Sequence, residues 1–155
     1  MLRRLRAFAR LPGETRTLIV EACLALMLGA LLAEMPLRWY ARWLGVRDVE
    51  HPAQPHDPLL IERVRQIGWA IRLIAGRVPF RSNCLPQAIA ARALLGRRGL
   101  PVTVYFGAAF TSRAGEALKA HAWARSGAII LTGNQPRRQF HAVARFTHTA
   151  KVQDS

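Results

Sequence analysis

Two residues of this sequence, Cys84 and His121, are of the types that carry nucleophilic catalysis, and a third, Asn134, could support them. Cys84 follows Asn83 at the start of an alanine-rich stretch whose apolar residues recur at helical spacing. A thiol in the first turn of a helix lies at the positive end of the helix dipole, and Arg81 adds a cation nearby. Both charges favour the thiolate, which is the nucleophilic form of cysteine. Cys84 is therefore a candidate nucleophile, and the alternative is a small buried core residue.

His121 lies in the segment KAHAW, which is followed by a short apolar run and the turn-like sequence GNQP. A cysteine peptidase needs a thiol, a histidine that takes and returns its proton, and a third group that orients the imidazole. Asn134 is the best placed for the third role, and Gln135 and Thr132 are the fallbacks. His141 is the rival base, but no comparable orienting group follows it in the sequence.

Helices are predicted for the part of the chain that leads up to the nucleophile. Residues 59–74 have one apolar face, with Asp57 as the cap and Pro58 at the first helical position. The helix that begins near Cys84 has Asn83 or Ser82 as its N-cap, and a Gly-Leu-Pro sequence at 99–101 ends it. Gln66 or Trp69 in the preceding helix is a candidate donor to an oxyanion.

Strands are predicted for the last third of the chain. The runs VTVYFGAAF, AHAWARS, GAIIL and FHAVARF are rich in β-branched and aromatic residues and are separated by short polar loops. Because the loops are short and no crossover helix is evident, the natural connection is an antiparallel sheet.

These motifs support a resemblance to a known family. The stretch NCLPQAIAARALLGRRGLPVTVYFG, followed by HAW and a closing strand, resembles the protease part of the B proteins of lasso-peptide biosynthesis. Those proteins belong to the transglutaminase-like branch of papain-like cysteine peptidases, and the resemblance covers most of the chain. It implies an α+β papain-like/transglutaminase-like fold, with N-terminal helices and the nucleophile helix packed on a C-terminal antiparallel sheet.

The resemblance also implies an activity. Cys84 would be the nucleophile and His121 the general base and acid of a leader peptidase that cleaves a ribosomally made lasso precursor through a thioester. The family usually supplies an Asp after the His, but no Asp or Glu lies between His121 and Asp154 here. Asn134 is therefore the expected third residue. An acyltransferase could use the same Cys and His. No cofactor and no metal is expected.

The resemblance implies three partners: the lasso precursor peptide with its leader and core, a separate leader-recognition protein and an ATP-dependent lasso cyclase. A net charge of +14 would in addition attract acidic peptides, nucleic acid or anionic membrane. A basic membrane- or nucleic-acid-binding protein with a structural Cys84 is thus the alternative class. The sequence carries no signature of the usual nucleic-acid-binding modules, so we do not expect nucleic acid as a partner.

At 155 residues the chain is expected to form one domain. Residues 1–45 would be a helical segment of that domain, 46–58 a linker loop, 59–150 the cysteine peptidase core and 151–155 a tail. His51 and His56 in the linker lack the tight spacing of a metal site. Cys23 and Cys84 form no disulfide framework, and a catalytic thiol suits a reducing compartment, so a cytoplasmic location is expected.

The segment from Leu18 to Ala33 is almost wholly apolar and allows three interpretations. It is a little short for a membrane span and carries Glu21 near its start. A signal peptide would explain the basic residues before it. A buried helix of a small domain is the preferred interpretation, with a membrane-associated helix as the next alternative.

Overall fold

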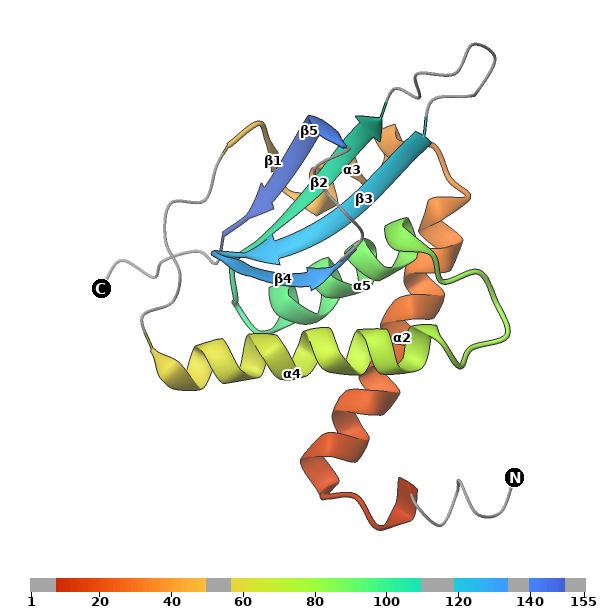
Figure 1. Cartoon of the computed structure of the whole chain (residues 1–155), viewed down its shortest axis with the longest axis vertical. Helices are drawn as coiled ribbons and strands as arrows, with labels where there is room; N and C mark the ends of the chain where they lie inside the picture. The colour runs from red at the N-terminus through yellow and green to blue at the C-terminus, as the bar shows by residue number, and fades with distance from the viewer. Residues whose placement is uncertain (1–7, 50–56, 110–118, 134–139, 150–155) are drawn as a thin grey trace.

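The computed structural model describes residues 8–49, 57–109, 119–133 and 140–149. Within these ranges the helices with defined bounds are α2 (Gly13–Ala33), α3 (Leu37–Leu44), α4 (Pro58–Ala75) and α5 (Cys84–Arg97). The strands are β1 (Val46–Arg47), β2 (Val102–Ala109), β3 (Lys119–Ser126), β4 (Ile129–Thr132) and β5 (His141–His148). They form one sheet in the order β1-β5-β2-β3-β4, and every neighbouring pair is antiparallel. Figure 1 shows α5 and α4 lying against this sheet, with α2 beyond them. The predicted α+β architecture is confirmed.

Helix α4 forms where the sequence predicts it, because its start is specified locally. Pro58 occupies the first helical position, where its missing N–H would have had no partner in the helix. The Asp57 carboxylate accepts a hydrogen bond of 2.9 Å from the backbone N–H of Leu59. Val64, Ile67 and Ile71 are buried in the core.

Helix α2 is a core helix on one face only. Ala22, Ala25 and Leu26 are buried against the rest of the domain. At Gly29 the helix approaches α5 so closely that a Cβ atom would lie 2.4 Å from the carbonyl oxygen of Pro86. Within the described ranges it is the one helix long and apolar enough to cross a membrane, although core helices pass the same test.

The chain between α2 and α4 contains a short helix, and its predicted linker differs from the expected loop because it begins with a short strand. Pro36 is the N-cap residue of the helix, α3, which begins at Leu37. The first two residues of the predicted linker, Val46 and Arg47, then form strand β1 and pair with Thr147 and Phe146 of β5. The remaining linker residues, apart from Asp48, Val49, Asp57 and Pro58, lie outside the described residues.

The core lies between the helices and one face of the sheet. Val104 and Phe106 of β2, Ala122 and Ala124 of β3 and Phe146 of β5 contribute to it from the sheet. From α5 come the buried Ala88, Ile89, Ala91, Leu94 and Leu95. Residues that alternate with these sheet residues, such as Tyr105 and Trp123, therefore lie on the other face.

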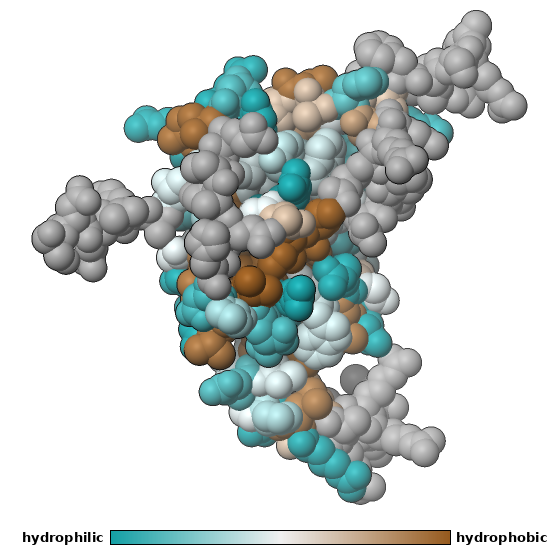
Figure 2. All heavy atoms as spheres, turned by 60° about the vertical axis from the view of Figure 1, so that its left-hand side comes forward, coloured by the Kyte–Doolittle hydropathy of each residue, from teal (hydrophilic) through white to brown (hydrophobic). Residues whose placement is uncertain are grey.

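The surface combines charge with exposed apolar side chains. Figure 2 shows mostly hydrophilic and neutral residues on the described part of one side, with a hydrophobic group near its centre. Large exposed apolar residues also follow the outward face of α2, namely Val20, Leu24, Met27, Leu28 and Leu31. One face of α2 thus serves the core while the other is apolar and open.

Candidate active site

Cys84 is the first residue of α5, as the sequence predicts. It is partly buried, carries a free thiol and packs against the hydrophobic core. Asn83 occupies the N-cap position with an extended backbone, but its side chain makes no capping hydrogen bond. The Ser82 hydroxyl instead donates to the carbonyl oxygen of Ala75 at 2.5 Å, and Gln87 Nε2 donates to the carbonyl oxygen of Ser82 at 2.7 Å. These two bonds tie the turn before Cys84 to the end of α4 and to the first turn of α5.

His121 is the third residue of β3, where it pairs with Gly107 of β2. Its side chain is buried among aromatic rings: the imidazole centroid lies 5.9 Å from that of Trp123 and 4.8 Å from that of Phe140. Nε2 lies 3.2 Å from the carbonyl oxygen of Gly133. Since a carbonyl oxygen only accepts, Nε2 is the donor, and Nδ1 of the neutral ring remains an acceptor.

The structure brings Cys84 and His121 to the same end of the domain but does not join them. Figure 1 shows that α5 begins near the end of the sheet at which β3 begins. Within the described ranges no hydrogen bond links the thiol to the imidazole. Ala122 packs into the core shared with α5, so His121 alternates to the opposite face, together with Trp123. A proton transfer between the two residues requires them to meet around the end of β3.

Two of the three candidates for the third catalytic role, Asn134 and Gln135, lie outside the described residues. Thr132 is fully buried, and its hydroxyl oxygen accepts a hydrogen bond of 3.2 Å from the backbone N–H of Ala124. That oxygen therefore supports the pairing of β3 with β4. The Gly133 carbonyl, which reasoning from side chains missed, is the group observed against the imidazole.

Glycine is required at position 133 for two reasons. Its φ of +74° is rarely adopted by other residues. A Cβ atom there would also lie 2.6 Å from Trp123 Cβ and 2.7 Å from the carbonyl oxygen of Ala122. The only signal in the sequence was the turn-like Gly-Asn pair, which marks the turn without revealing which carbonyl it would aim at His121.

The remaining candidates occupy varied positions. His141 is the exposed first residue of β5 and pairs with Ala108, near the same end of the sheet. Gln66 and Trp69 line a groove between α4 and the start of α2. Gln66 Nε2 also lies 3.3 Å from a carboxylate oxygen of Glu62. Neither residue is shown in contact with Cys84.

No metal-binding cluster is found in the part of the chain that the structure describes. Those residues contain no group of three or more His, Cys, Asp and Glu side chains that could hold a metal ion. His51 and His56 of the predicted linker lie outside them. The expectation that the whole chain lacks a metal site therefore stays a prediction.

A cysteine at the start of a helix that packs on an antiparallel sheet is the framework of the papain-like and transglutaminase-like thiol enzymes. The family model of the transglutaminase-like superfamily matches residues 27–145, and the chain belongs to this superfamily. No curated protein and no solved structure matches the chain. Membership agrees with the predicted fold and is consistent with a cysteine peptidase or an acyltransferase, both of which form a thioester with the cysteine.

Proposed function

We propose that this protein is the leader peptidase of lasso-peptide maturation, a hydrolase that cuts the bond between leader and core through a thioester on Cys84. The observation that carries the proposal is the position of Cys84 as the first residue of α5 in a transglutaminase-like domain. The first turn of a helix leaves backbone N–H groups without partners, and these stabilise negative charge on the sulfur and on an adjacent oxyanion.

The reaction proceeds in two halves. The sulfur of Cys84 attacks the carbonyl carbon of the scissile bond while His121 Nδ1 accepts the thiol proton. His121 then gives this proton to the leaving nitrogen, which becomes the free amino terminus of the core, and the leader remains as a thioester. Water attacks the thioester with His121 as the base, the C–S bond breaks, and the leader carboxylate and the thiol are released.

The assignment of the base has a structural requirement. His121 and Cys84 must approach each other around the end of β3 for the proton to pass between them. His141 lies at the same end of the sheet and is the alternative base. Asn134, the residue that follows Gly133 in the sequence, remains the proposed side-chain partner of His121.

The activity is proposed to depend on partners. A separate leader-recognition protein would deliver the precursor, and an ATP-dependent cyclase would use the amino terminus that cleavage frees. The basic surface and the open apolar face of α2 are surfaces to which such partners could dock. We place the protein in the cytoplasm, with peripheral membrane contact through the same face of α2 as the alternative use of that face.

The test is mass spectrometry of a lasso precursor incubated with this protein and its recognition partner. We expect a leader-sized product that is lost in Cys84→Ala but kept in Cys23→Ala, which removes the other thiol. Retention of cleavage in Cys84→Ala would overturn the proposal. An added primary amine separates hydrolysis from acyl transfer, because an acyltransferase would leave the amine attached to the leader's carboxyl end.

A second pair of variants identifies the base. His121→Ala should abolish cleavage while His141→Ala leaves it within about twofold, because only His121 has an orienting partner in the described structure. The reverse pattern would transfer the role to His141.

A further inference from the structure

A groove lies directly before the nucleophile in the chain. Its walls are the second half of α2, with Met27, Ala30 and Leu31, the C-cap residue Glu34, and the segment Phe80–Arg81 that leads to Cys84. Its volume is about 370 Å³, within the range of roughly 300–1,000 Å³ that is common for ligand pockets. We call it the Phe80 groove.

We propose that the Phe80 groove binds a large apolar side chain of the substrate peptide, next to the bond that Cys84 attacks. This inference rests on the proposed function and adds the chemical class of residue that the enzyme selects.

The position of the groove relative to the nucleophile is fixed by hydrogen bonds. Phe80 and Arg81 stand just before Ser82, whose hydroxyl is held by the end of α4 and whose carbonyl is held by Gln87 of α5. The wall of the groove and the turn that presents Cys84 are thus parts of one braced segment. A side chain seated in the groove would hold the adjoining peptide bond close to that turn.

The walls of the groove select for an apolar side chain. Met27, Leu31 and Phe80 supply apolar surface, and Leu31 is 66% exposed, so much of this surface faces solvent. Covering this surface with an apolar side chain removes apolar area from water, which is favourable. Methionine adapts its shape to different partners, which suits a site that accepts more than one apolar residue.

The charges at the groove favour a peptide over a phosphate-bearing ligand. Arg81 and Glu34 both line it, and within the described ranges neither forms an ion pair. A peptide main chain offers carbonyl groups to Arg81 and N–H groups to Glu34. A nucleic acid or a lipid headgroup would bring its phosphate close to the Glu34 carboxylate, which repels it. The substrate peptide is therefore the occupant that matches the whole lining.

The experiment compares two identical substitutions of exposed leucines. Leu31→Ser changes the groove, and Leu59→Ser removes a leucine of similar exposure, 73% against 66%, that lies on α4 and does not line the groove. For cleavage of the precursor peptide with its recognition partner, we expect the KM of Leu31→Ser to rise about tenfold with kcat nearly unchanged. Leu59→Ser should match the wild-type protein. Equal KM values for the two variants would overturn the groove proposal while leaving the peptidase intact.

A binding assay keeps the proposal testable if no cleavage occurs. The assay uses fluorescein-labelled precursor peptides. In this peptide set, each residue beside the leader–core junction is replaced in turn by Leu, Phe, Asp or Lys. Each peptide is titrated with the Cys84→Ala protein, and its binding is followed by fluorescence anisotropy. At one position we expect Leu and Phe to bind about tenfold more tightly than Asp or Lys, and Leu31→Ser to remove that preference. A preference for Leu and Phe without any cleavage would support the groove proposal and refute the peptidase proposal. A lack of preference at every position would refute the groove.

Discussion

The imidazole of His121 is held by the main chain: its Nε2 lies 3.2 Å from the carbonyl oxygen of Gly133. No Asp or Glu follows His121 until Asp154, so the acidic partner expected from the family is missing from the sequence. A backbone carbonyl can accept from Nε2 and fix the tautomer, leaving Nδ1 free to act as a base. It carries no full negative charge, so it would orient an imidazolium without neutralising it.

Gly133→Ala should therefore lower the rate of the proposed cleavage reaction. The new Cβ would lie 2.6 Å from Trp123 Cβ, and the turn must shift, moving the carbonyl away from His121. A misplacement of about 1 Å can cost about a hundredfold in rate, so we expect kcat to fall ten- to a hundredfold with KM little changed. Single-turnover kinetics with the precursor measure this.

The matched control is Gly76→Ala, since a Cβ at Gly76 would meet no atom within 4 Å. It should retain the wild-type rate. If Gly133→Ala retained that rate as well, the Gly133 carbonyl would have no orienting role.

Gly29→Ala should destabilise the fold and shift the start of α5, where Cys84 lies. Its Cβ would lie 2.4 Å from the carbonyl oxygen of Pro86, a backbone atom two residues after Cys84 that cannot rotate aside. Overpacking of this kind costs about 1–3 kcal/mol of unfolding free energy. Urea denaturation measures the loss. Gly13→Ala, whose nearest contact would be Arg16 Nη2 at 4.0 Å, should be neutral, and equal midpoints would contradict the close α2–α5 crossing.

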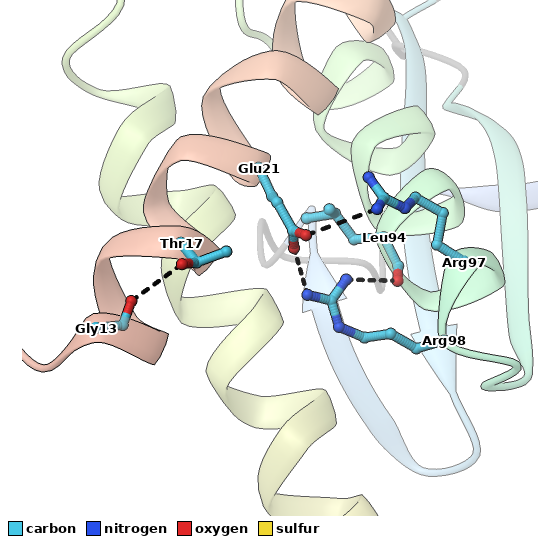
Figure 3. Close-up of polar contacts among 6 residues, drawn as sticks. All are labelled: Gly13, Thr17, Glu21, Leu94, Arg97 and Arg98. Atoms are coloured by element: carbon cyan, nitrogen blue, oxygen red, sulfur yellow. Dashed lines mark hydrogen bonds and ion pairs between the residues drawn. The ribbon is translucent and has the colours of Figure 1, made fainter.

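Glu21→Gln should weaken the attachment of α2 to the end of α5. Figure 3 shows the Glu21 carboxylate between the guanidinium groups of Arg97 and Arg98, with an ion-pair distance of 3.8 Å to Arg97. The Glu21 side chain is only 19% exposed, whereas that of Arg97 is largely in solvent. We expect the free energy of unfolding to fall by about 1 kcal/mol, and by less at high salt. Glu14→Gln is the control, because Glu14 forms no ion pair in the described part of the chain. An equal loss of stability in Glu14→Gln would contradict a stabilising role for the Glu21 ion pairs.

The free energy of unfolding should decrease as the pH is lowered, and His148 is a group that causes this decrease. Burial, together with the nearby Arg92 guanidinium, lowers the pKa of His148 below its usual 6.5. Below pH 6.5 the unfolded chain therefore binds a proton that the folded chain resists. The stabilisation is present above that pH and is lost as the pH falls through the lowered pKa.

Denaturation midpoints at pH 8 and pH 5 test this effect. We expect His148→Gln to lose less stability between the two pH values than the wild-type protein. His141→Gln, at an exposed position on the same strand, should behave as the wild-type protein does. If His148→Gln lost as much stability between pH 8 and pH 5 as the wild-type protein, groups other than His148 would be responsible for the loss.

Local patterns in the sequence predicted much of the fold. The cap at Asp57 and the apolar period of α4 depend on residues a few positions apart, and both are observed. The strands of the antiparallel sheet follow from alternation and short loops. Strand β1 was missed, because two residues carry no period and pair only after β5 is in place.

The residues of the candidate site also differ in whether local sequence or tertiary structure determines their positions. Cys84 at the start of a helix is set by the Asn-Cys-Leu-Pro sequence and its apolar period, which are local. The face of β3 on which His121 lies depends on how the strand registers against β2, and a shift by one residue would reverse it.

The sequence by itself determined the order of the main helices and strands, the nucleophile candidate and the absence of an acidic residue between His121 and Asp154, because each depends on neighbouring residues. Only the tertiary structure decided that the Gly133 carbonyl holds the imidazole, that α2 crosses α5 at Gly29 and that the Phe80 groove adjoins the turn before Cys84. These relationships join residues distant in the chain. They arise from burial and close packing, which no local pattern encodes.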